Sequence, residues 1–115
     1  EQLEAARYLP YLKKDGVVVT NTQKIDPMPV ITGAADYPAG LLEKIGAAGA
    51  RLTAVDALRL AEEAGSQKAV NVVLIGAMAS SLDIPEESWL AAIEKTVPAK
   101  FLEMNKRAFA LGYRA

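Results

Sequence analysis

The run Gly16–Thr20 (GVVVT) is the feature that most restricts what this chain can fold into. Its three consecutive valines show no alternation with polar residues, which is typical of a strand covered on both faces, as in a parallel sheet. A second run, Ala50–Val55, has a similar character. Because parallel strands are joined by crossover connections that are usually helical, the two runs predict an α/β fold with a mainly parallel sheet.

Helical patterns flank both runs. Apolar positions recur at helical spacing over Leu3–Leu12, although Pro10 interrupts them, and Tyr37–Gly49 has Pro38 in its first turn and glycines at its end. Asp56 is placed to cap a helix over Ala57–Gly65. Two or three strands are too few for a complete sheet, and the chain opens in mid-helix without Met, so we expect a truncated sheet that lacks N-terminal strands.

The second half of the sequence predicts helices alone. Ala69–Leu82 is apolar nearly all round, so we expect it to be buried. Pro85 and Pro98 each precede a further amphipathic segment, and the last of these ends at Gly112. We therefore expect residues 1–115 to form a single domain with a helical C-terminal half.

Composition excludes several classes of partner. The 13 basic and 14 acidic residues nearly cancel, and no basic stripe is interleaved with aromatics, so nucleic acid is not expected as a partner. No apolar run approaches the ~20 residues that cross a bilayer, and no signal-peptide pattern opens the chain. These features predict a cytoplasmic protein that does not enter a membrane.

The 115 residues include no cysteine and no histidine. This excludes thiolate nucleophiles, histidine-based triads, histidine metal sites and cysteine-ligated iron–sulfur clusters from the chain itself. The adjacent acids Glu62 and Glu63 point in different directions on a helix, and the glycines of Gly46–Ala50 follow a helix, whereas a phosphate loop precedes one. We expect no catalytic residue and no metal ligand here.

The strongest candidate site is the polar cluster Asn21, Thr22 and Gln23, at the carboxyl end of the first predicted strand. Ligands of open parallel sheets bind at such ends. Met28 follows between two prolines, and Val30 with Ile31 suggests a short extended piece. The alternative is that the polar side chains merely shape a turn that the prolines stiffen. The residues alone leave both interpretations open.

Asn71 lies on the most apolar predicted helix, where a buried amide must find partners. Its amide makes either a structural bond to a loop backbone or a contact with a ligand or partner subunit. We therefore predict a buried polar contact at this position.

Three segments, Arg7–Pro38, Asn71–Met78 and Val97–Gly112, together resemble the small, gamma-type subunit of 2-oxoacid:ferredoxin oxidoreductases, most closely the indolepyruvate branch. The resemblance covers nearly the whole chain, and its most specific part is the Pro-Met-Pro loop followed by Tyr37 and Pro38. The glycine-rich loop that follows the first strand of the family is absent from this sequence.

The resemblance implies a Rossmann-like three-layer sandwich, of which this chain would be the C-terminal part. It implies an accessory subunit of an enzyme that converts a 2-oxo acid, coenzyme A and oxidised ferredoxin into acyl-CoA, CO2 and reduced ferredoxin. Thiamine diphosphate and the iron–sulfur clusters would belong to a large catalytic subunit, with coenzyme A as co-substrate. The loop with Asn21, Thr22, Gln23 and Met28 would then face that partner or its ligand.

Two other functions remain open. One is a nucleotide-binding α/β domain whose phosphate loop lies outside these residues. The other is a purely structural interaction module, in which the last helix and Trp89 form an interface, since aromatic side chains often anchor such contacts.

Overall fold

The computed structural model describes all residues from Glu1 to Ala115. The chain forms two compact units, Glu1–Ala54 and Val55–Ala115, and each is described by itself. That residues 1–115 act as one domain stays a prediction.

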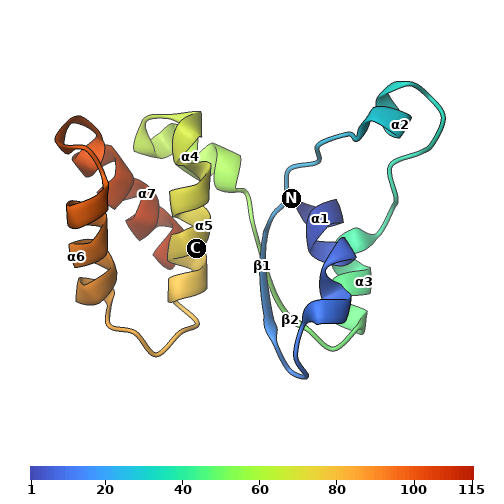
Figure 1. Cartoon of the computed structure of the whole chain (residues 1–115), viewed down its shortest axis with the longest axis horizontal. Coiled ribbons are helices and arrows are strands. Elements are labelled where there is room, and N and C mark those ends of the chain that lie inside the picture. The colour runs from blue at the N-terminus through green and yellow to red at the C-terminus, as the bar shows by residue number, and fades with distance from the viewer. The chain divides into compact units, whose positions relative to one another are not determined.

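The first unit holds the sheet, whose two strands are β1 (Val17–Asn21) and β2 (Arg51–Val55) (Figure 1). They pair in parallel, and at their start the Arg51 N–H donates to the Gly16 carbonyl at 2.9 Å. The β-branched valines of β1 favour this extended backbone. The predicted α/β class, with a small parallel sheet and a helical C-terminal half, is confirmed.

Helices of the first unit pack beside the strands. Pro10 divides the helical pattern near the start, so that α1 (Gln2–Arg7) ends early and a 3-10 turn, η1 (Leu9–Tyr11), follows it. Helix α3 (Leu41–Ala47) packs against α1 and buries Leu41 and Ile45. Those two side chains are the buried apolar side chains of this unit, and that of Ile45 is fully buried.

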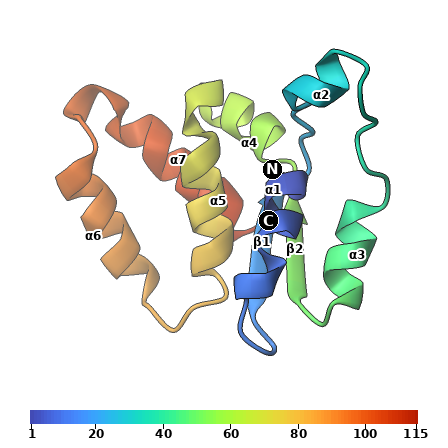
Figure 2. The same cartoon turned by 45° about the vertical axis from the view of Figure 1, so that its right-hand side comes forward.

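A long loop between β1 and α3 carries the short helix α2 (Met28–Ile31), which extends away from the rest of the first unit (Figure 2). The extended piece predicted at Val30 and Ile31 is therefore wrong. Both residues donate their N–H groups to the Pro27 carbonyl, at 2.9 and 3.1 Å. Proline fixes φ near its helical value, so Pro29 favours a helical first turn here instead of a strand.

The second unit is helical (Figure 1). Its first helix, α4, starts where predicted, because the Asp56 carboxylate accepts the Arg59 N–H at 3.1 Å, and it stops at Gly65, whose φ is 128°. Its elements are α4 (Ala57–Ala64), η2 (Gln67–Ala69), α5 (Val70–Ala79), α6 (Glu86–Thr96), η3 (Ala99–Phe101) and α7 (Leu102–Tyr113).

Helices α5 and α7 make the main contact of the second unit, and their backbones touch. A methyl group added at Gly76 would overlap the Phe109 carbonyl, and one added at Gly112 would overlap the Val73 carbonyl. Glycine at both positions is therefore what permits this close approach. The side chains of Val73 and Phe109 are fully buried beside the crossing.

Helix α5 is not buried on all sides as predicted. Its face with Val73, Gly76 and Ala77 is buried, whereas Ile75 and Met78 are 39% and 38% exposed. An apolar sequence shows that all sides of a helix could be buried. It does not show how many other elements of the same unit pack against that helix.

Trp89 joins α6 to this core. Its ring lies 6.3 Å from that of Phe109, and its indole Nε1 is buried with no hydrogen-bond partner. Trp89 is thus half-buried against α7, as expected for an amphipathic helix. No helix of the structure is both long enough and apolar enough to cross a membrane.

Candidate functional site

The polar cluster forms a tight turn where β1 ends. Asn21 is only 4% exposed, and its Oδ1 accepts the N–H of Gln23 at 3.2 Å. Its Nδ2 donates to the Gln23 Oε1, also at 3.2 Å. An Asn side chain that bonds the backbone two residues on imitates a turn of main chain, so this geometry supports a role in shaping the loop.

Two residues at the start of α1 hold the base of the loop. Gln2, which is 5% exposed, donates from its Nε2 to the Thr22 carbonyl at 2.8 Å. The Oε2 of Glu1 accepts the Tyr37 hydroxyl at 2.7 Å and the Ile25 N–H at 3.3 Å. Both ends of the loop are therefore attached to one short helix.

Charge contributes to the attachment of the loop to Glu1, as the pKa values of Glu1 and Tyr37 show. Burial acts to raise the pKa of Glu1, but the hydrogen bonds from Tyr37 and from the Glu4 and Ile25 N–H groups outweigh it, so this pKa is lowered. Burial and the bond to the Glu1 carboxylate raise the pKa of Tyr37 to about 12. The Lys24 ammonium lies 5.6 Å from the centre of the Tyr37 ring, close enough for a cation–π contact.

Beyond this base, the tip of the loop is apolar and exposed. Ile25, Met28 and Ile31 are 58%, 66% and 64% exposed. Backbone bonds hold the turn that follows α2 to this helix, including the bond from the Ala35 N–H to the Pro29 carbonyl at 3.0 Å. Exposed large apolar side chains on a loop are a common feature of contact surfaces.

The structure brings together three of the four predicted loop residues, Asn21, Thr22 and Gln23. Met28 lies apart from them, on α2. Asn71 corrects a prediction, because it is exposed on α5 and not buried. It lies on the opposite side of α5 from Val73, on the face that this unit leaves uncovered.

Sequence reasoning missed Glu1, Gln2 and Tyr37, which fix the loop. Gln2 and Thr22 are 20 residues apart, and Glu1 and Tyr37 are 36 apart. The residues next to Gln2, Thr22, Glu1 or Tyr37 in the sequence give no sign of these long-range bonds. The one available signal was Tyr37 itself, an aromatic residue with a polar end beside Pro38 at the end of a loop.

No three acidic, histidine or cysteine side chains come together as a metal site. The arrangement that the structure does provide is a loop fixed at its base by hydrogen bonds and apolar at its tip. Chemically this suits recognition of another surface more than proton or group transfer.

Comparison with known proteins identifies the class. The family described as pyruvate ferredoxin/flavodoxin oxidoreductase matches residues 1–115. The chain therefore belongs to this family. No solved structure matches the chain.

Within this family, the curated relatives that match the chain are indolepyruvate oxidoreductase subunits. The chain is 43% identical over 120 residues to the indolepyruvate oxidoreductase subunit IorB of Thermococcus kodakarensis and 41% identical over 122 residues to that of Pyrococcus horikoshii. Both alignments include 100% of this chain and 59% of the relative. The subunit IorB of Archaeoglobus fulgidus is 37% identical over 98% of the chain and 58% of its own length. The chain thus spans about three fifths of the length of these relatives.

Proposed function

We propose that this chain is part of the small, accessory subunit of an indolepyruvate:ferredoxin oxidoreductase. The observation that carries the proposal is the 43% identity, over the whole of this chain, to a protein named indolepyruvate oxidoreductase subunit IorB. With a large catalytic subunit it would convert an arylpyruvate, coenzyme A and oxidised ferredoxin into acyl-CoA, CO2 and reduced ferredoxin.

The cofactors of that reaction belong to the large subunit in this proposal. Iron–sulfur clusters are held by cysteine thiolates, and these 115 residues contain no cysteine, so they do not fit a cluster. Thiamine diphosphate would supply the chemistry that stabilises the carbanion after decarboxylation. The complex would work in the cytoplasm, where ferredoxin would collect the electrons.

The loop between β1 and α3 is, in this proposal, the surface that meets the large subunit. The base at Asn21, Thr22 and Gln23 sets its direction, and the tip at Met28 and Ile31 supplies apolar area. Fixing a loop before binding reduces the entropy lost on association, so the bonds at its base favour a docking role.

The accessory role is tested by co-expressing the full-length subunit with its large partner and measuring indolepyruvate-dependent ferredoxin reduction. We expect activity that needs both subunits. Equal activity from the large subunit alone would contradict the proposal.

The role of the loop is tested with Ile31→Ser, compared with Ile84→Ser as a matched control on an exposed position of the second unit. Removing an apolar contact from an interface commonly costs 1–2 kcal/mol, which corresponds to about a 5- to 30-fold weaker association. We expect that loss for Ile31→Ser in subunit titrations and none for Ile84→Ser. Equal affinities for both variants would remove the loop from the interface.

A further inference from the structure

A groove of about 310 Å³ lies between two turns at the amino end of the sheet. One turn leads from η1 into β1, and the other leads from α3 into β2. The Arg51 N–H donates to the Gly16 carbonyl where the two strands start, so this bond holds the turns side by side. The walls of the groove are therefore fixed to each other by the sheet.

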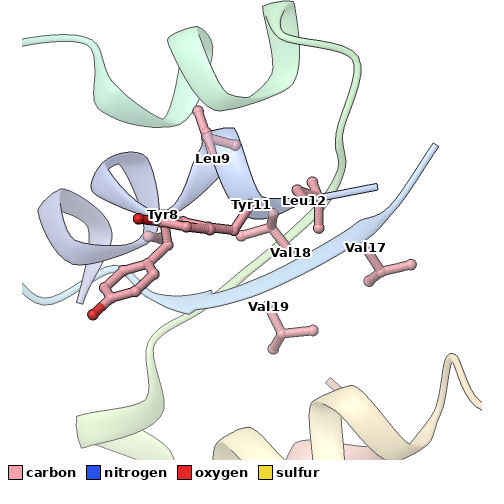
Figure 3. A pocket seen from close by; sticks show the side chains of 8 residues that line it. Tyr8, Leu9, Tyr11, Leu12, Val17, Val18 and Val19 are labelled. Carbon is pink, nitrogen blue, oxygen red and sulfur yellow. The ribbon is translucent and has the colours of Figure 1, made fainter. Parts of the chain in front are cut away.

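The floor of the groove is apolar. Leu9 and Leu12 line it and are half-buried, and Leu9 points from η1 toward α3 (Figure 3). The facing turn contributes Ala48 and Ala50, whose small side chains leave the space between the turns open. The groove can therefore take up an apolar side chain from another polypeptide.

The rim of the groove is positively charged. Lys13 and Lys14 line it and are exposed, and Arg51 follows directly after the groove residue Ala50. None of these three cations forms an ion pair within the chain. Asp15 is the one acidic residue among those that line the groove. Cations without partners around an apolar hollow favour an apolar side chain that is flanked by carboxylates.

The second unit presents a segment of this kind between α5 and α6. This acidic segment, Leu82–Glu87, reads LDIPEE, and its Leu82 and Ile84 side chains are each 45% exposed. No lysine or arginine occurs between residues 69 and 94. The three carboxylates of the segment form no ion pair within the chain: Asp83, Glu86 and Glu87.

We propose that the groove docks the acidic segment of a second copy of this chain. Leu82 and Ile84 place apolar area against the floor, and the flanking carboxylates meet Lys13 and Lys14. A contact of this small size gives a weak and transient association. Neither surface includes the loop between β1 and α3 that is proposed to meet the large subunit, so this contact goes beyond the proposed function.

The first test is sedimentation velocity on the full-length subunit, at rising protein concentration and at two salt concentrations. We expect self-association that is at least about 5-fold weaker in about 0.5 M salt than in about 0.05 M salt, because salt screens exposed charges. A subunit that stays monomeric up to about 1 mM at the lower salt concentration overturns the proposal. Association that salt does not weaken overturns it as well.

Two charge-reversed variants identify the surfaces. Lys13→Glu with Lys14→Glu makes the groove acidic, and Asp83→Lys with Glu87→Lys makes the segment basic. Each variant alone places like charges at the contact, so we expect at least about 10-fold weaker association. A mixture of the two variants restores opposite charges at each contact between unlike copies, so we expect mixed pairs with nearly the original affinity. Variants that associate no better together than alone overturn the proposal.

Lys68→Glu with Lys100→Glu is the matched control, because it changes the net charge as much as the groove variant does, at exposed positions outside both surfaces. We expect the control to associate like the unmodified subunit. A loss as large as that of the groove variant would assign the effect to net charge and overturn the proposal.

Melting curves followed by circular dichroism show whether each variant is folded. If a charge-reversed variant is not folded, Leu82→Ser decides, since it changes no charge and alters an exposed side chain. We expect at least about 5-fold weaker self-association for Leu82→Ser, because an apolar contact at the floor is lost. Unchanged self-association of this variant overturns the proposal.

Discussion

The Glu1 carboxylate accepts three hydrogen bonds: from the Glu4 N–H, the Ile25 N–H and the Tyr37 hydroxyl. One side chain thereby caps a helix and fixes both ends of a loop. The pKa directions follow from this: the carboxylate is favoured in its charged form and the phenol in its neutral form. The arrangement is complete only while both protonation states hold.

The stabilising effect of this cluster should therefore have a limited pH window. Glu1 has a lowered pKa, so its contribution is present above the unfolded pKa near 4.5 and is lost as the pH falls through the folded value. Tyr37 has a raised pKa, so its contribution is full below 10 and is lost as the pH rises from 10 toward about 12.

We predict that Glu1→Gln lowers the pKa of Tyr37 part of the way from about 12 toward 10, since burial remains but the charged acceptor is gone. An NMR titration of the Tyr37 ring measures it. Glu4→Gln is the control, because the exposed Glu4 carboxylate pairs with Arg7 and not with Tyr37. A Tyr37 midpoint unchanged by Glu1→Gln would show that the bond is not formed in solution.

At this scale the sequence suggested the local turn at Asn21 as one of two interpretations and gave no sign of the contacts between distant segments. The turn at Asn21 and Gln23 follows from the known habit of Asn to bond a nearby backbone group. The contact of Glu1 with Tyr37 depends on tertiary packing of segments 36 residues apart, which no short pattern encodes.

Among the elements, α5 and α7 depend on each other more than any other pair. Their crossing is set by backbone contact at Gly76 and Gly112, where an added methyl group would overlap the backbone of the facing helix. The sequence alone did not predict this crossing, because Gly112 was interpreted as the end of a helix and not as a contact.

We predict that Gly76→Ala or Gly112→Ala costs about 3 kcal/mol or more in the free energy of unfolding, the upper end of the effect of overpacking. The new methyl group meets backbone, which cannot rotate aside. Gly46→Ala on α3 is the matched control, since nothing lies within 4 Å of its added methyl. We expect that control to be neutral or about 0.5–1 kcal/mol stabilising. Urea denaturation measures all three, and equal effects at all three positions would contradict the close crossing.

For the molecule as a whole, burial is uneven. The first unit has Leu41 and Ile45 as its buried apolar side chains, and every other buried apolar side chain lies in the second unit. The sequence predicted both strand runs and the helical half, because each depends on local pattern. The division into two units was not predicted, since it depends on which residues contact each other across the chain.

We predict that Glu1–Ala54 opens before Val55–Ala115, because less apolar area is buried there to oppose opening. Hydrogen exchange read by mass spectrometry should show faster exchange in peptides of β1 and β2 than in peptides of α5 and α7. Equal rates in the two sets of peptides would mean that the chain opens as one cooperative block.

The position of Trp89 matters for experiments that follow this opening by tryptophan fluorescence. Trp89 is the only tryptophan in the chain, and its environment is the ring of Phe109 on α7, inside the second unit. Emission excited at the red edge of the indole band therefore reports the helical unit alone. A fluorescence melt can look fully native while the sheet has already come apart, and only a probe in residues 1–54 would reveal it.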